Sequence, residues 1–219
     1  MTERVPEFAL LVGVFLGLSA AVSGAVLTGE LFRPILTGVV VCYPFAVFGV
    51  VRSEDPSEAL PPRPVLAFGT VLGVVTLLAA AVERPNDVLS GLAASLVVTL
   101  PPAAYATRFG ADVNPLSPVQ TLVVTAAVGA VFLAFAPLLG TLSAIVGLVV
   151  GLSGALYADA RGFRPTHRQR RLGIVGGVLA GVAVAWFGLA MQLPLAPTTA
   201  TAAALVLAPS LFAAITRER

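Results

Sequence analysis

Long apolar runs separated by short polar segments dominate this chain. A bilayer-spanning helix needs about 20 mostly apolar residues, within a range of about 17–25, and eight runs satisfy this requirement. The pattern therefore predicts an all-α fold, a polytopic transmembrane helix bundle of about eight helices that forms a single membrane domain over residues 1–219. The predicted helices cover residues 8–27, 35–51, 65–82, 88–106, 119–139, 141–158, 172–193 and 198–216.

Two of these divisions depend on turn signals inside longer uncharged stretches. Residues 119–158 hold no charge over 40 residues, and one helix of that length would measure about 60 Å, twice the thickness of the hydrocarbon core. We place its turn at residues 137–140, Pro-Leu-Leu-Gly. The second stretch, 172–216, breaks at residues 194–197, Pro-Leu-Ala-Pro, because two prolines fix φ and lack amide donors.

The composition identifies lipid as the main solvent of the chain. Hydrophobic residues make up 58% and charged residues 11%, with a mean hydropathy of +0.97, whereas soluble domains carry about 25% charged residues. The net charge of +2 is too small to indicate a nucleic-acid partner. Cys42 is the only cysteine, which excludes an internal disulfide and a cysteine-based zinc site.

The distribution of arginine predicts the orientation. All 13 basic residues are arginine, and with eight helices 11 of them fall on the side that holds both termini. Only Arg33 and Arg84 fall on the other side. Positive residues favour the cytoplasmic side, so we predict a cell-membrane protein with both termini in the cytoplasm. The first segment is expected to stay as a membrane helix, since residues 1–7 hold one arginine and two glutamates, unlike a signal peptide.

An internal repeat of about 55 residues predicts four tandem helical hairpins. The second helix of each hairpin ends at an arginine, and the intervals between these arginines are 56, 53 and 56 residues. The first helix of each hairpin carries two small residues four apart, a spacing that lets two membrane helices approach closely. The arginines are Arg52, Arg108, Arg161 and Arg217, and the small pairs are Gly13/Gly17, Gly69/Gly73, Thr125/Gly129 and Gly177/Gly181.

Prolines inside the predicted helices indicate where backbone carbonyls lose their helical donors. A proline frees the carbonyl one turn earlier, and in lipid this carbonyl needs another partner. Pro101 and Pro102 make the strongest break, with Ser95 and Thr99 beside them. Transporters place substrate sites at broken helices, so we predict a ligand-binding site here. Tyr43, beside the intrahelical Pro44, is added as a lining residue; a kink that only shapes the bundle is the alternative interpretation.

One short string carries a resemblance to a catalytic motif. Gly151, Leu152, Ser153 and Gly154, followed by Tyr157, resemble the nucleophile motif of rhomboid intramembrane serine proteases over about one helical turn. Such a serine needs a histidine base from a neighbouring membrane helix. The only histidine, His167, lies in an arginine-rich segment outside the predicted helices, so we predict no catalytic role for Ser153.

Two polar segments between predicted helices carry enough charge to be candidate binding sites. Residues 159–171 hold five arginines, which are interpreted either as the topology determinant of the adjacent helices or as a contact for anionic lipid head groups. Residues 52–64 hold three carboxylates without metal-ligand spacing, so no metal and no cofactor are predicted. The five arginines are Arg161, Arg164, Arg168, Arg170 and Arg171.

Three functions remain open on this pattern. No charged residue falls inside a predicted helix, although ion-coupled carriers and lipid-processing enzymes usually keep one there. We favour a small permease for a neutral or weakly polar solute, by analogy with repeated transporter hairpins. The alternatives are a structural or accessory subunit that packs against another membrane protein, a second copy or lipid, and, least favoured, a membrane enzyme.

Overall fold

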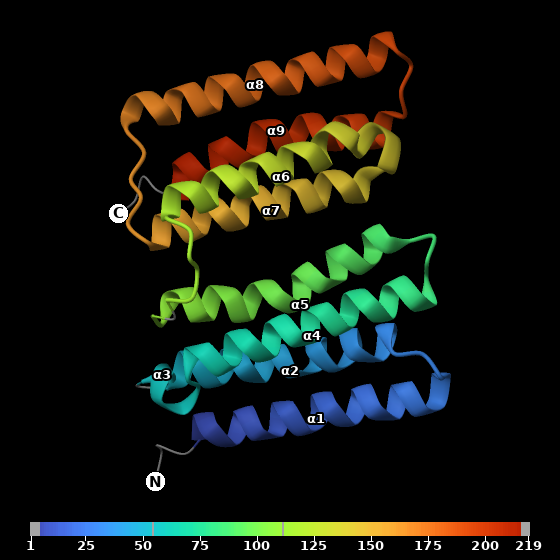
Figure 1. Cartoon of the computed structure of the whole chain (residues 1–219), viewed down its shortest axis with the longest axis vertical. Coiled ribbons are helices and arrows are strands. Elements are labelled where there is room, and N and C mark those ends of the chain that lie inside the picture. Colours follow the sequence, from blue (N-terminus) through green and yellow to red (C-terminus); the bar gives the residue numbers. More distant parts are fainter. Residues whose placement is uncertain (1–4, 54, 111, 216–219) are drawn as a thin grey trace. The chain divides into compact units, whose positions relative to one another are not determined.

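A computed structural model describes residues 5–53, 55–110 and 112–215. Over these residues the chain folds into nine helices, and no β-strand is formed there (Figure 1). Eight of the helices are 20–24 residues long and apolar enough to cross a membrane, while α3 has only 4 residues. The helices are α1 (Val5–Thr28), α2 (Phe32–Arg52), α3 (Pro56–Ala59), α4 (Pro62–Glu83), α5 (Val88–Arg108), α6 (Pro118–Leu139), α7 (Thr141–Ala160), α8 (His167–Ala190) and α9 (Leu195–Ile215). The all-α, polytopic fold predicted from the sequence is thereby confirmed.

Several helices extend beyond the predicted apolar runs. α8 begins at His167, five residues before the predicted start at 172, because Thr166 caps it in a capping box with Gln169. α9 begins at Leu195 and keeps Pro197 in its first turn, where a missing amide hydrogen removes no helical bond. The predicted break at 194–197 therefore falls earlier, around Gln192, whose φ is 53°. Residue 216, the predicted end of the last helix, lies outside the described residues.

The chain consists of two compact units, Met1–Val113 and Asn114–Arg219. Each unit contains two hairpins of long helices, α1–α2 and α4–α5 in the first, α6–α7 and α8–α9 in the second. A single membrane domain over the whole chain remains a prediction.

Short turns join the helices of each hairpin. α6 and α7 are connected by Gly140 alone, which has φ of 98°, a left-handed value that glycine adopts without steric cost. Its amide donates to the carbonyl of Ala136 at 2.8 Å and closes the end of α6. The turn predicted at 137–140 is therefore present, with Pro137 still inside α6.

The two helices of each hairpin approach closely at small residues. In α1–α2, a methyl group added to Gly17 would lie 2.6 Å from the carbonyl oxygen of Gly38, and one on Gly38 would lie 2.5 Å from that of Gly17. Gly129 and Gly147 make the same reciprocal approach in α6–α7, at 2.6 and 2.7 Å. Distances this short leave room only for hydrogen, so Cα–H groups face carbonyl oxygens across the seam.

The same seam recurs in all four hairpins at equivalent positions. The second residue of each small pair faces residues four apart on the partner helix, and the first faces a residue three positions further on. The third hairpin inverts one contact: Thr125 replaces the glycine, and Gly154 opposite makes the space. The contacts are Gly17 with Gly38 and Cys42, Gly73 with Ser95 and Thr99, Gly129 with Gly147 and Gly151, Gly181 with Ala202 and Val206; then Gly13 with Phe45, Gly69 with Pro102, Thr125 with Gly154, and Gly177 with Pro209. The four tandem hairpins thus repeat in their packing as well as in their order.

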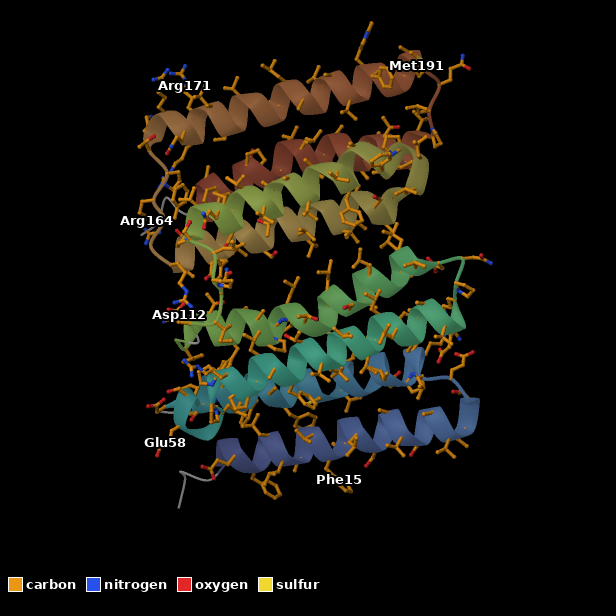
Figure 2. All side chains as sticks on the ribbon, viewed as in Figure 1. Phe15, Glu58, Asp112, Arg164, Arg171 and Met191 are labelled. Carbon is orange, nitrogen blue, oxygen red and sulfur yellow. The ribbon has the colours of Figure 1, made fainter. Side chains whose placement is uncertain are left out.

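In each unit, one helix of one hairpin packs against both helices of the other hairpin. In the first unit α2 packs on α4 and α5, and Phe32 forms a buried cluster with Ala79 and Ala80 of α4. In the second unit α9 packs on α6 and α7, around Leu133, Ala136, Ala144 and Ala204. α1 packs on α2, and α8 on α9. The large apolar side chains on the other faces are exposed, as Phe15 of α1 is (Figure 2), and suit contact with lipid.

Candidate functional site

The predicted site around Pro101 and Pro102 lies in the middle of α5, which remains continuous through both prolines. A proline at position i cannot donate to the carbonyl of residue i−4. Pro101 therefore leaves the carbonyl of Val97 without its helical donor, and Pro102 does the same for Val98. Val98 is 1% exposed, so its carbonyl must find a partner inside the protein.

Tyr43 of α2 provides this partner. Its hydroxyl donates to the carbonyl oxygen of Val98 at 2.7 Å, with the oxygen of Val97 also near at 3.3 Å. The prediction from the sequence joined Tyr43 to the two prolines as parts of one site, and the structure brings them together through these carbonyls. The hydrogen bond compensates for the helical donors that the prolines lack, so that α5 has no unwound segment at this point.

Ser95 and Thr99 face α4 across the hairpin seam. The Ser95 hydroxyl donates to the carbonyl of Gly73 at 2.8 Å, and the Thr99 hydroxyl donates to the carbonyl of Ser95 at 2.8 Å. A methyl group on Gly73 would lie 2.0 Å from the Thr99 hydroxyl oxygen, so only glycine permits this approach. Pro102 lies against Gly69 in the same seam. These three residues therefore pack α4 against α5, while Tyr43 joins α2 to α5.

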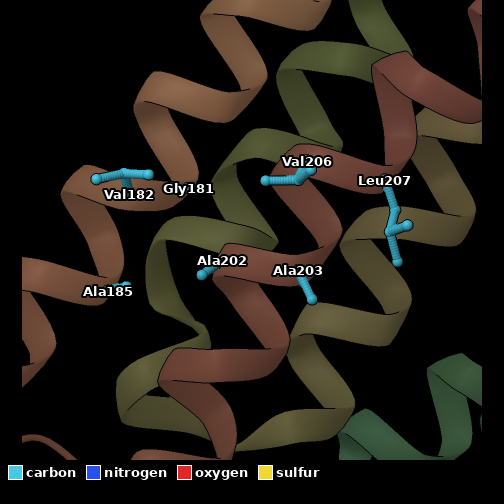
Figure 3. A pocket seen from close by; sticks show the side chains of 7 residues that line it. All are labelled: Gly181, Val182, Ala185, Ala202, Ala203, Val206 and Leu207. Atoms are coloured by element: carbon cyan, nitrogen blue, oxygen red, sulfur yellow. The ribbon is translucent and has the colours of Figure 1, made fainter.

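An apolar groove lies in the second unit, whereas the predicted site belongs to the first. This α8–α9 groove has a volume of about 440 Å³ and opens where the two helices approach at Gly181 (Figure 3). It is lined by Gly181, Val182, Ala185, Ala202, Ala203, Val206 and Leu207. No polar side chain lines it, which fits it for a hydrocarbon rather than for a polar solute.

The segment with the five predicted arginines runs from the end of α7 to the start of α8, and some of its arginine side chains contact neighbouring residues. Asp159, 6% exposed at the end of α7, forms an ion pair with Arg164, and Arg161 lies over the ring of Tyr157, 5.6 Å from its centroid. Arg168 and Arg171 are exposed within the first five residues of α8. Arg161 and Arg164 thus have local partners, whereas Arg168 and Arg171 extend into the surroundings.

Ser153, the serine of the rhomboid-like string, lies within α7. Its hydroxyl donates to the carbonyl of Val150 in the same helix at 2.8 Å. His167, the only histidine, is the first residue of α8 and is exposed. That Ser153 has no catalytic role stays a prediction. Among the described residues, no group of three or more His, Cys, Asp or Glu side chains is placed to hold a metal ion.

Two polar contacts that connect elements were not predicted from the sequence. The Glu83 carboxylate at the end of α4 accepts hydrogen bonds from the amides of Leu31 and Phe32, at 2.5 and 3.1 Å. It thereby caps the N-terminus of α2, because the side chain of the N-cap residue Leu31 makes no capping hydrogen bond. The Tyr105 hydroxyl lies 2.7 Å from the carbonyls of both Pro56 and Leu60 and fastens α3 to α5. The absence of a capping side chain at the start of α2 was the available signal for Glu83.

Comparisons with known proteins add no family to this description. No family model, no curated protein and no solved structure matches the chain. The eight apolar helices define the class, a multi-pass membrane protein.

Proposed function

We propose that this chain is a structural or accessory subunit of the membrane, which packs against another polytopic membrane protein. The observation that carries the proposal is the state of the deep polar groups at the candidate site. Tyr43 and Ser95 donate to backbone carbonyls of a neighbouring helix, and Thr99 donates to a carbonyl of its own helix. A transport path needs polar groups that can turn to a solute, whereas a packing element needs them engaged as they are here.

The second unit supports the same function. Ser143 is fully buried and donates to the carbonyl of Phe132 at 2.7 Å, which joins α7 to α6. Thr198 and Thr201 of α9 are buried and donate to the carbonyls of Pro194, directly before α9, and of Pro197, in its first turn. Since hydroxyl donors to carbonyls stabilise helix packing in lipid, these groups serve the architecture of the bundle.

The test compares the chain alone with the chain in its native membrane. Purified protein in proteoliposomes should leave the permeability to glycerol and urea equal to that of protein-free vesicles. In nanodiscs excised directly from its natural membrane, the chain should occur at a constant ratio to one other polytopic protein. A solute flux raised by the purified chain, together with nanodiscs that hold only this chain, would reject the proposal.

A small permease for a neutral or weakly polar solute is the second candidate. The observation in its favour is that Tyr43 and the two carbonyls released by proline meet at mid-helix between two hairpins, where a hydroxylated solute can exchange with the Tyr43 hydroxyl. A flux of this kind would be independent of a proton gradient, because an unperturbed tyrosine titrates near pH 10. It would change in Tyr43→Phe and persist after addition of an uncoupler.

A further inference from the structure

We propose that the α8–α9 hairpin binds one anionic phospholipid, with its phosphate at the first turn of α8 and one acyl chain in the α8–α9 groove. The inference goes beyond the proposed function and does not depend on it. It rests on two observations that occur on the same pair of helices: an exposed cationic cluster at one end, and an apolar groove further along the same face.

The cationic cluster consists of Arg168 and Arg171, both exposed within the first five residues of α8, with the exposed His167 beside them. The spacing of three and four residues places them as neighbours on the helix surface. No acidic residue lies in that first turn, although a helix N-terminus favours negative charge. The position therefore combines arginine side chains with the positive end of a helix, both of which attract a phosphate group.

The other charged groups nearby leave this cluster available. The carboxylate of Asp159 is occupied by Arg164. Within the described part of the chain, neither Arg168 nor Arg171 has a carboxylate partner. Arg171 and Arg164 lie at the end of α8 that follows α7, whereas Met191 lies at the opposite end (Figure 2). Arginines at the end of a spanning helix lie at head-group depth.

The groove lies on the same face of α8 as Arg171. Positions 171, 178, 182 and 185 are separated by seven, four and three residues, and this spacing keeps them on one side of a helix. From Arg171 to Gly181 is ten residues, or about 15 Å, which equals half the thickness of the hydrocarbon core. An acyl chain that descends from a head group at Arg171 thus passes Val178, exposed at 39%, and reaches the groove with its distal end.

The chemistry of the groove selects a hydrocarbon chain as its occupant. Its floor is formed by Gly181, whose Cα approaches the carbonyl of Ala202 so closely that a methyl group would lie 2.8 Å from that oxygen. The groove is shallow at Ala185 and Ala203, because alanine side chains are short (Figure 3). A flexible chain fills such a shallow apolar depression between close-packed helices, while the phosphate, held by the arginines, supplies the preference for anionic lipid.

Native mass spectrometry of the purified full chain tests the head-group contact. The chain is titrated with phosphatidylglycerol or phosphatidylcholine of identical acyl chains. We expect one high-affinity phosphatidylglycerol, and we expect the double variant Arg168→Gln/Arg171→Gln to lose about 30-fold of the preference, roughly fivefold for each arginine near the surface. The double variant Arg63→Gln/Arg108→Gln removes the same charge elsewhere and should keep the preference. An equal loss in both double variants, or none in the first, would overturn the proposal.

A second pair of variants tests the groove. Ala203→Phe places a ring in the groove from an exposed position, whereas Ala183→Phe places the same ring on an exposed face of α8 outside it. Ala203→Phe should weaken binding of phosphatidylglycerol several-fold, and Ala183→Phe should not. Inorganic phosphate should fail to displace the lipid, because it cannot use the groove. Displacement by phosphate, or equal binding in the two phenylalanine variants, would show a soluble-anion site and reject the lipid.

Discussion

At the scale of the residue, hydroxyl groups in this protein act mainly on backbone carbonyls. Proline removes helical donors in lipid, where no water replaces them, and the single hydroxyl proton of Tyr43 goes to the carbonyl of Val98, with that of Val97 3.3 Å from the hydroxyl oxygen. Ser95 and Ser143 reach carbonyls of the neighbouring helix in their hairpins. A single side chain can therefore determine whether two helices of this bundle stay together.

Tyr43→Phe tests this role directly. The ring is kept and only the hydroxyl is lost, which leaves the carbonyls of Val97 and Val98 without their donor. We expect a loss of about 1–2 kcal/mol in the free energy of unfolding, measured by SDS titration in mixed micelles. Tyr157→Phe is the matched control, because the ring contact with Arg161 remains. Equal stability of Tyr43→Phe and the unchanged protein would contradict the role given to the hydroxyl.

The hydrogen bonds by which Asp55 caps α3 depend on the protonation of this one carboxylate. The Ser57 hydroxyl, and next the Ser57 amide, donate to its carboxylate and hold the pKa of Asp55 below its ordinary value. A lowered pKa means that the capping bonds are fully present above about pH 4, the unfolded value, and are lost as the pH falls through the folded pKa. The chemical shift of the Ser57 amide should follow this titration. In Asp55→Asn the amide oxygen can still cap, and the shift should stay constant over the same range.

At the scale of the element, the hairpin is the repeating unit. The positions of glycine along its helices determine where the two helices approach most closely. Gly176 and Gly177 are adjacent in α8 but meet different surroundings. A methyl group on Gly177 would lie 2.4 Å from the carbonyl oxygen of Leu205, whereas one on Gly176 would have nothing within 4 Å. The repeat predicted from spacing thus corresponds to a physical seam that faces the partner helix in each hairpin.

This pair of glycines yields a matched prediction. Gly177→Ala should destabilise the protein by about 1–3 kcal/mol, because the backbone of α9 has to move away. Gly176→Ala should be neutral or stabilise by up to about 1 kcal/mol, since alanine favours the helix. Thermal unfolding of both variants in the same detergent provides the comparison, and a Gly176→Ala variant less stable than Gly177→Ala would show that the seam is misplaced.

At the scale of the whole molecule, an even number of spans predicts that both ends of the chain lie on one side of the membrane. On this prediction each hairpin returns the chain to the side from which it started, and the segments between hairpins share that side. The arginine count, 11 against two, predicts that this side is the cytoplasm.

Reporter fusions test this orientation. A fluorescent protein that matures only in the cytoplasm should be bright when fused after Arg219 and dark when inserted at Pro85, between α4 and α5. The reverse pattern would reject the predicted orientation while leaving the hairpins intact. Equal brightness at both positions would reject the eight-span topology, because these two points must then lie on one side.

Much of this architecture followed from the sequence alone. Hydropathy and length predicted eight helices, since lipid demands that each span satisfy its own backbone within an apolar run. The turn at Gly140 and the small pairs of the hairpins could also be predicted, because both depend on local spacing. For the same reason the sequence indicated that Pro101 and Pro102 leave two backbone carbonyls without helical donors, but it did not indicate which group donates a hydrogen bond to them.

Only the tertiary structure decided the partners of these groups. The hydroxyl of Tyr43 meets a carbonyl 55 residues away, and Glu83 caps a helix that begins 51 residues earlier. Likewise the α8–α9 groove exists because two helices separated by a turn pack at Gly181. Local spacing sets which groups need a partner, whereas the packing of distant helices sets which partner they find, because contacts across a bundle depend on how side chains from separate spans fit together in space.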